Sequence, residues 1–301
     1  MNWLFYFGLL MISFFWGTSF AGVKIGLTYV SQVELVLVRL IIAATLFAII
    51  LFAVRKKIDV RIKREDYGLL VWLSFIGVAS YYPIQTFAVN LTITIHTALI
   101  MATSPILTAI MAVFMNKERM GKGAILGIAT AFAGVSMIIT GGDNSSAAAN
   151  PNMLWGDLVL MINSLTWAYF TIKGGQLMKK YLPFISMAYI FIIGTLMIIP
   201  FAVLYSFYQP IDITKAFSGG YELILIFLYL GGLCSVYSYF FWYKAVREIG
   251  PVKTSVFMYL NPLFAMVVGI SVLGEQVNIY SALGGVLVLA GVYMVNRSKM
   301  T

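Results

Sequence analysis

Long apolar stretches separated by short polar loops recur along the whole chain. Ten of them approach the length of about 20 residues that an α-helix needs to cross the hydrocarbon core of a bilayer. They cover residues 3–23, 33–54, 67–87, 93–115, 122–140, 154–172, 184–206, 221–243, 252–273 and 278–296. The pattern predicts an all-α membrane protein with ten transmembrane helices.

Composition supports a lipid environment. Hydrophobic residues make up 61% of the 301 residues and charged residues only 10%, whereas soluble domains are about 45–50% apolar. The basic excess, 20 Lys and Arg against 11 Asp and Glu, lies in short loops, so it indicates membrane orientation and not nucleic-acid binding. One cysteine and one histidine exclude an internal disulfide and a multi-His or Cys-cluster metal site. We expect no metal and no other cofactor.

The basic residues predict which way the chain crosses the membrane. With the N-terminus inside, Lys24 and Lys215 are the only basic residues in outer loops, and Arg39 lies within a span. All the others fall in inner loops or in the C-terminal tail. Because basic residues favour the cytoplasmic side, we expect both termini in the cytoplasm and the protein in the inner (cytoplasmic) membrane.

The second half of the chain repeats the first. At a shift of about 157 positions, residues that interrupt the apolar pattern coincide. The matches include Tyr82 with Tyr239, Pro105 with Pro262, Glu118 with Glu275, Gly127 with Gly284 and Gly134 with Gly291, while Trp16 matches Trp167 at a shorter shift. We therefore predict repeats at residues 1–140 and 154–301, joined by an outer linker at 141–153.

Each predicted repeat holds five spans. Because five is odd, the second copy must cross the membrane in the opposite orientation to the first. Inverted repeats are typical of secondary transporters, which bind substrate near the midplane between the two halves.

Several of these positions belong to motifs of a known family. The motifs are Phe15-Trp16-Gly17-Thr18-Ser19, Ser104-Pro105, Lys117-Glu118, Gly127, Gly134, Ala245, Gly250-Pro251, Leu260-Asn261-Pro262, Leu273-Gly274-Glu275, Gly284 and Gly291. Over essentially its whole length the chain resembles the EamA family of the drug/metabolite transporter superfamily. The resemblance implies ten helices, two EamA repeats, and efflux or exchange of metabolites. The family often has Glu-Pro in the ninth span, so Asn261 removes the carboxylate that would titrate a proton there.

Arg39 lies about 9 Å inside the second predicted span at the helical rise. An arginine at the centre of a membrane helix costs about 2.5–3.5 kcal/mol, so its position requires an explanation. One explanation is a cation that faces a cavity and holds a substrate carboxylate or phosphate. The alternatives are a salt bridge with Glu34 or a side chain that extends to the membrane surface. Apart from Glu34, no carboxylate lies well inside a predicted span, which disfavours a carrier of drug cations.

Aromatic residues away from the span ends are candidates for a substrate pocket. They are Trp16, Tyr82, Trp167, Tyr239 and Trp242, and the hydroxyl of Thr18 lies near the first of them. Amphipathic rings suit pockets that bind organic ligands. The alternative is that they pack between helices or form an interfacial belt.

Pro105 and Pro262 lie inside the fourth and ninth predicted spans. Proline removes a backbone hydrogen bond, and in a membrane the freed carbonyl must face protein or a cavity. Both prolines are therefore candidate hinges, although a kink that only aids packing is the alternative. Asn261, next to Pro262, is a candidate substrate contact.

Polar residues at span ends are the remaining candidates. His96 and Lys253 occupy matching positions at the starts of the fourth and ninth spans, where they contact substrate or anchor the interface. Glu118 and Glu275 end the fourth and ninth spans, where they act in gating or cap helices.

The sequence carries no nucleotide-binding, metalloprotease or triad motif, so we do not expect an enzyme. We predict a secondary transporter, an exporter or exchanger of small metabolites such as amino acids or organic anions. It would work by alternating access, coupled to protons or a counter-substrate. A multidrug efflux carrier and a non-transporting membrane partner protein are the alternatives. Substrate identity, direction and oligomeric state stay open.

Overall fold

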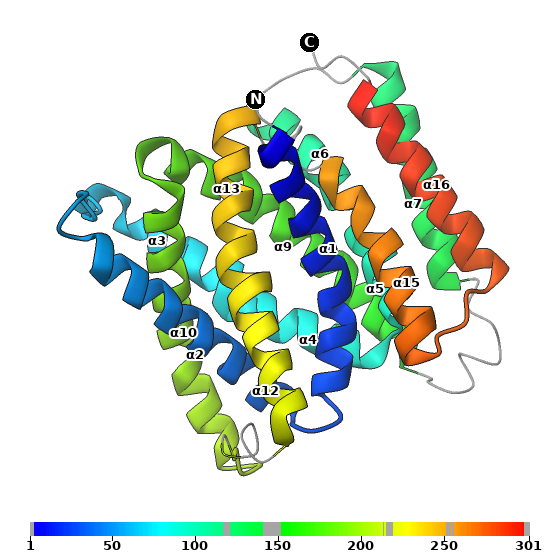
Figure 1. Cartoon of the computed structure of the whole chain (residues 1–301). Coiled ribbons are helices and arrows are strands. Elements are labelled where there is room, and N and C mark those ends of the chain that lie inside the picture. The colour runs from blue at the N-terminus through cyan, green and yellow to red at the C-terminus, as the bar shows by residue number, and fades with distance from the viewer. Residues whose placement is uncertain are drawn as a thin grey trace.

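The computed structural model describes residues 3–116, 121–140, 152–212, 214, 219–250, 254 and 256–297. Every regular element within these residues is a helix (Figure 1). The prediction of an all-α membrane protein is confirmed.

Ten helical segments follow one another in the described chain, one for each predicted span. The first half holds α1 (Trp3–Gly26), α2 (Gln32–Val54), the continuous α3 (Tyr67–Ser74), η2 (Phe75–Ser80) and α4 (Tyr81–Leu91), the pair α5 (Thr94–Met101) and α6 (Ser104–Asn116), and α7 (Lys122–Thr140). The second half holds α9 (Met153–Lys180), α10 (Pro183–Ser206), the continuous α12 (Gly220–Leu228), η3 (Tyr229–Tyr237) and α13 (Ser238–Ile249), the pair η4 (Val256–Leu260) and α15 (Asn261–Leu273), and α16 (Ile279–Arg297). Among the described residues, six helices are long and apolar enough to cross a membrane unaided.

The halves share their irregularities. The third and eighth segments each contain a π-helix, η2 and η3. The fourth segment breaks at residues 102–103, before α6, and the ninth opens with the 3-10 helix η4, before α15. Pro105 and Pro262 therefore stand in the first turn of a new helix, where the missing N–H costs no hydrogen bond. They follow breaks in the spans and do not kink a continuous helix.

The two halves run in opposite directions. Where α7 and α16 pack side by side (Figure 1), a Cβ added to Gly134 would meet Gly284, and one added to Gly291 would meet Gly127. Contacts that ascend along one helix and descend along the other define antiparallel helices. Because α7 and α16 are the fifth segments of their halves, the halves are inverted copies.

The other segments pack in the same symmetric way, so that a contact made by a segment of one half is repeated by the corresponding segment of the other half. α1 packs against α13 and α15 of the second half, and α9 packs correspondingly against α4 and α6 of the first half. α2 packs on η3 as α10 packs on η2. The centre of the molecule is therefore built jointly by both halves.

Some predictions fall outside the described residues. The predicted linker lies at 141–153, and residues 141–151 are not described, so the boundaries 1–140 and 154–301 stay predictions. Glu118 and Lys253 are also outside the described part of the chain. In the predicted orientation, the end of the bundle at which α1 ends and α2 begins faces the outside of the cell, and we call it the outer end.

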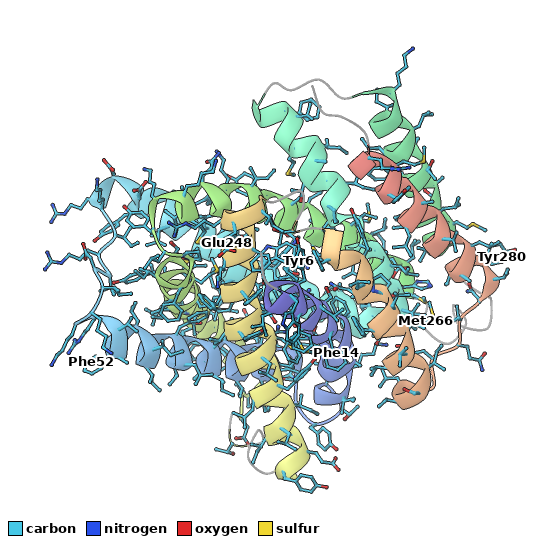
Figure 2. All side chains as sticks on the ribbon, turned by 45° about the horizontal axis from the view of Figure 1, so that its top comes forward. Tyr6, Phe14, Phe52, Glu248, Met266 and Tyr280 are labelled. Atoms are coloured by element: carbon cyan, nitrogen blue, oxygen red, sulfur yellow. The ribbon has the colours of Figure 1, made fainter. Side chains whose placement is uncertain are left out.

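The surface is apolar and the interior contains polar groups. Figure 2 shows Phe52 and Tyr280 at opposite edges of the bundle, and Phe52 is 63% exposed. Buried positions include Arg39, His96 and Asp157. A bilayer explains this distribution because lipid covers apolar side chains while ionisable groups turn inward.

Candidate functional site

A cavity lies between the two halves at the middle of the bundle. It is lined by Trp16, Ser19, Phe20, Arg39, Tyr81, Tyr82, Gln85, Met101, Trp167, Tyr239, Met258 and Asn261. Six of these residues, Trp16, Arg39, Tyr82, Trp167, Tyr239 and Asn261, are candidates named from the sequence. They come from α1, α2, α4, α9, α13 and α15, so segments of both halves converge on one space.

The cavity is small in this conformation. Its volume is about 30 Å³, and one water molecule needs at least roughly 10–15 Å³ by this measure. About two water molecules fit, and a metabolite does not. Binding of any organic substrate therefore requires the walls to move apart.

Symmetry-related aromatic rings form the walls. The rings of Trp16 and Trp167 meet edge to face with centroids 5.1 Å apart, and those of Tyr82 and Tyr239 lie 6.4 Å apart. Trp16 also contacts Tyr239 at 5.6 Å. Trp242 packs behind Trp16 at 5.1 Å and is 1% exposed, so it supports the wall without lining the cavity.

The π-helix η3 supplies polar groups to this wall. Trp16 donates its indole N–H to the carbonyl of Cys234 at 3.0 Å, and Arg39 Nε donates to Ser235 Oγ at 3.2 Å. A π-helix disturbs the regular hydrogen-bond ladder and is frequent at functional sites. This local irregularity in the eighth segment positions both a predicted aromatic residue and the predicted cation.

Arg39 is buried and is paired with no carboxylate among the described residues. Its side chain is 4% exposed, its guanidinium lies 4.5 Å from the centre of the Tyr82 ring, and its Nη1 has no hydrogen-bond partner. Glu34 instead accepts hydrogen bonds from the backbone N–H groups of Ser31 and Asp212. The structure thus contains neither the alternative salt bridge nor an arginine that reaches the membrane surface.

Other polar atoms that line the cavity can also bind a ligand. Asn261 is the first residue of α15, is 4% exposed, and its Oδ1 has no hydrogen-bond partner among the described residues. Gln85 donates to the hydroxyl of Tyr81 at 2.8 Å. The cavity can therefore offer a cation, an amide oxygen and hydroxyl groups to a polar ligand.

Six lining residues were not candidates in the sequence analysis: Ser19, Phe20, Tyr81, Gln85, Met101 and Met258. Ser19 and Phe20 lie one helical turn after Trp16, and Gln85 lies one turn after Tyr82. Helical spacing from the predicted aromatic residues would have found these three. Met101 and Met258 have no such signal because ordinary core positions look the same.

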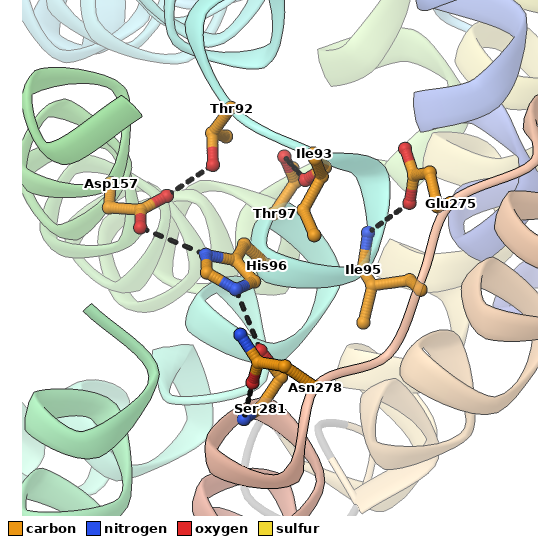
Figure 3. A network of polar contacts seen from close by, with 9 residues as sticks. All are labelled: Thr92, Ile93, Ile95, His96, Thr97, Asp157, Glu275, Asn278 and Ser281. Atoms are coloured by element: carbon orange, nitrogen blue, oxygen red, sulfur yellow. Dashed lines mark hydrogen bonds and ion pairs between the residues drawn. The ribbon is translucent and has the colours of Figure 1, made fainter. Parts of the chain in front are cut away.

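Two candidates for substrate contact lie elsewhere. Thr18 is half-buried and hydrogen-bonds the hydroxyl of Tyr229, away from the lining residues. His96 lies at the outer end, where its Nδ1 is 3.0 Å from Asp157 Oδ2 and its Nε2 is 2.8 Å from Ser281 Oγ (Figure 3).

Asp157 corrects the sequence analysis. It is 1% exposed in α9 and also accepts a hydrogen bond from the Thr92 hydroxyl (Figure 3). The statement that Glu34 alone among carboxylates lies well inside a span is therefore wrong. Asp157 stands near the start of the predicted span 154–172, where position alone does not distinguish an interfacial carboxylate from a buried one.

Glu275 caps a helix of the other half. Its carboxylate accepts from the backbone N–H groups of Thr94 at 2.7 Å and Ile95 at 3.1 Å in the first turn of α5, and Figure 3 shows the contact with Ile95. Lys24 Nζ approaches it at 4.0 Å. The loop after α15 is thereby tied to α5 at the outer end. Among the described residues, no three His, Cys, Asp or Glu side chains gather as a metal site.

The profile of the EamA-like transporter family matches residues 3–140 and 154–297. The chain belongs to the EamA-like transporter family. It is therefore a multi-pass membrane protein of a transporter family, and a small-molecule substrate follows from that membership.

Relatives resemble the chain over nearly its whole length. An "Uncharacterized transporter" of Archaeoglobus fulgidus is 28% identical and covers 94% of both chains. The "Uncharacterized transporter YyaM" of Bacillus subtilis is 29% identical over 95% of this chain and 92% of its own. A "Probable terminal-alkyne amino-acid exporter" of Streptantibioticus cattleyicolor is 24% identical over 95% of this chain and 91% of its own.

A solved structure shares the fold of this EamA-like chain. It is titled "Crystal structure of protein", covers 98% of this chain and 96% of its own, and has a TM-score of 0.66 at 13% identity. Similarity at this identity concerns the arrangement of helices and not the substrate.

Proposed function

We propose that this EamA-like protein is a secondary transporter of small metabolites that carry a carboxylate, such as amino acids or organic anions. The substrate binds in the central cavity, and the carboxylate pairs with Arg39. The single observation that carries this proposal is a buried guanidinium in the cavity wall that has no carboxylate partner among the described residues.

The energetics favour an anionic group at this position. Burying an arginine in a membrane protein is costly, and here Nη1 lacks a partner. A substrate carboxylate supplies the missing acceptor, and a hydrogen bond to a charged group contributes about 1.5–3 kcal/mol. The aromatic walls then contact the apolar part of the same molecule.

The charge of the cavity argues against the multidrug alternative. Drug cations require a buried carboxylate, and no acidic residue is among the described side chains that line the cavity. Asp157 is buried but pairs with His96 at the outer end. The relative from Streptantibioticus cattleyicolor, named a probable terminal-alkyne amino-acid exporter, agrees with a carboxylate-bearing substrate.

Transport proceeds by alternating access of the cavity to the two sides. Inverted halves can exchange conformations of similar energy, which gives outward-open and inward-open states. The breaks before Pro105 and Pro262 are symmetry-related positions that can serve as hinges of the fourth and ninth segments. The protein acts in the cytoplasmic membrane with both termini in the cytoplasm, as exporter or exchanger.

A flux assay in proteoliposomes tests the proposal. Vesicles are loaded with radiolabelled amino acids or dicarboxylates, and release is compared for wild type, Arg39→Gln and Arg55→Gln. Arg55 is a matched control because it follows the same helix, is exposed and packs over the Phe52 ring.

We expect Arg39→Gln to weaken the apparent affinity about 10- to 150-fold and Arg55→Gln to transport like wild type. Unchanged anion flux through folded Arg39→Gln protein would falsify the proposal. Transport of organic cations with no flux of any carboxylate would do so as well.

A further inference from the structure

His96 and Asp157 form a buried hydrogen-bonded pair that joins the two halves at the outer end. His96 lies on α5 of the first half, and Asp157 lies on α9 of the second half, 3.0 Å apart and each 1% exposed. Thr92, just after α4, and Ser281 of α16 complete the contact (Figure 3). Ionisable groups inside a membrane protein are costly and usually functional, and neither side chain contributes to the substrate cavity.

The contact accommodates two protonation states without moving a heavy atom. With a neutral imidazole, Nδ1–H donates to Asp157 and Nε2 accepts from the Ser281 hydroxyl. When a proton binds to Nε2, the new N–H donates to the same Ser281 oxygen, because a hydroxyl is both donor and acceptor. The observed distances of 3.0 Å and 2.8 Å suit either arrangement.

The two states differ in net charge. Neutral His96 beside ionised Asp157 leaves one uncompensated negative charge in the closed interface, while protonated His96 makes the pair neutral. An unpaired buried charge is far more costly than a paired one. The closed arrangement, in which the pair is buried, therefore favours the protonated pair.

Among the described residues of the elements that pack against α5, the other charged groups near the pair are few and already engaged. Glu275 accepts from the first turn of α5 and is approached by Lys24 of α1 at 4.0 Å. On α16, Tyr280 is exposed, and the described part of α7 carries its one charged residue, Lys122, at the opposite end. None of these groups compensates the charge of Asp157 as His96 does.

The helices that carry the pair also reach the substrate cavity. α5 places Met101 and α9 places Trp167 in the cavity wall, and the Ser164 hydroxyl of α9 contacts Met101 Sδ at 3.3 Å. Separation of α5 from α9 at the outer end would move both residues. The pair is thus mechanically linked to access to the cavity.

We propose that His96 and Asp157 form a proton-binding site, distinct from the substrate cavity, whose occupancy closes the outer end of the transporter. A proton from the outer solution binds the imidazole and stabilises the closed state. Its release leaves the negative pair, which favours separation of the halves. This inference rests on the proposed transport cycle and adds the proton as its coupled ligand.

Distance measurements between the halves test the proposal without any substrate. Spin labels are placed at Asn90 and Ile279, which are exposed outer-end positions of the first and second halves, in a Cys234→Ser background. Distances are recorded in lipid nanodiscs between about pH 5 and pH 8, the interval in which histidine charge changes. The same chain, labelled with ¹⁵N-histidine and free of a histidine tag, reports the charge of its single histidine in parallel.

We expect the labels to move apart as the imidazole loses its proton, with the closed-to-open ratio changing by at most about tenfold per pH unit for one proton. Asp157→Asn and His96→Gln should abolish this response. Ser281→Ala, which keeps both ionisable groups, and Glu275→Gln should retain it.

Several results would overturn the proposal. They are a wild-type distance that does not follow the imidazole charge, an imidazole with constant charge over this interval, and a pH response that survives in Asp157→Asn and His96→Gln. Loss of flux in the Arg39 experiment bears on the substrate site alone, because the distances are measured without substrate.

Discussion

Replacing Glu275 should open the outer end of the transporter. Its carboxylate accepts from two backbone N–H groups in the first turn of α5, at Thr94 (2.7 Å) and Ile95 (3.1 Å). Both residues are at most 1% exposed, so water does not readily replace the lost acceptors. Because Glu275 belongs to the second half and α5 to the first, the contact stabilises only arrangements in which these elements meet.

The size of the effect follows from these two hydrogen bonds. Loss of a helix cap costs about 0.5–2 kcal/mol, and loss of a negative charge near a helix N-terminus costs roughly 0.3–1 kcal/mol more. Glu275→Ala should therefore destabilise the closed state by about 1–3 kcal/mol, a factor of roughly 5–150 in its population. Glu275→Gln keeps one acceptor oxygen and loses the charge, so its effect should be intermediate.

The spin-label pair at Asn90 and Ile279 measures this population directly, and the apparent melting temperature of the purified protein gives a second reading. Lys24→Gln is the matched control. Lys24 approaches Glu275 only at 4.0 Å, beyond hydrogen-bonding distance, so Lys24→Gln leaves both capping hydrogen bonds of Glu275 in place. If Glu275→Ala leaves both the distances and the melting temperature at wild-type values, the capping contact does not hold the outer end closed.

Three further perturbations follow from the structure. Gly134→Ala would place a Cβ 2.6 Å from the Gly284 carbonyl oxygen, so α7 and α16 must separate at a cost of about 1–3 kcal/mol; an unchanged melting temperature would contradict this. Trp16→Phe leaves a buried carbonyl without its 3.0 Å donor and should lower stability by about 1–3 kcal/mol, whereas equal unfolding curves would refute that role. Asp66 lies at the inner end, just before α3. Its hydrogen bonds, of which the one from Lys180 has the largest effect, hold its pKa below the usual value. The stabilisation that the ionised Asp66 contributes is present at neutral pH and is lost as the pH falls through the lowered pKa. Asp66→Asn should therefore lower the melting temperature at pH 7 more than at about pH 3. An equal effect at both pH values would show that this contact does not stabilise the protein.

The substrate cavity was partly predictable because it is made by repeated positions. Trp16 and Trp167, and Tyr82 and Tyr239, match between the halves, and symmetry requires matched central residues to converge. Arg39 was recognisable because a cation inside an apolar span is costly. Trp242, also predicted to contact substrate, packs behind the wall, because an aromatic residue behind the wall has the same sequence pattern as one that lines it.

The polar contacts at the outer end were much less predictable. His96 was a candidate, but its partner Asp157 lies 61 positions away on a helix of the other half. Glu275 was a candidate for gating or capping, yet the helix that it caps begins 181 positions earlier. Distances along the chain carry no information about which loop meets which helix across an inverted pair of repeats.

By itself the sequence determined the ten spans, their all-helical nature and the inverted duplication. These properties depend on local apolar length, because a backbone in lipid must satisfy its hydrogen bonds within each helix, and on the odd number of spans in each repeat. Only the tertiary structure decided that the cavity has a volume of about 30 Å³, that Arg39 has no carboxylate partner among the described residues, and that His96 meets Asp157. Such facts depend on how side chains from separate helices fill a shared space, which local pattern does not encode.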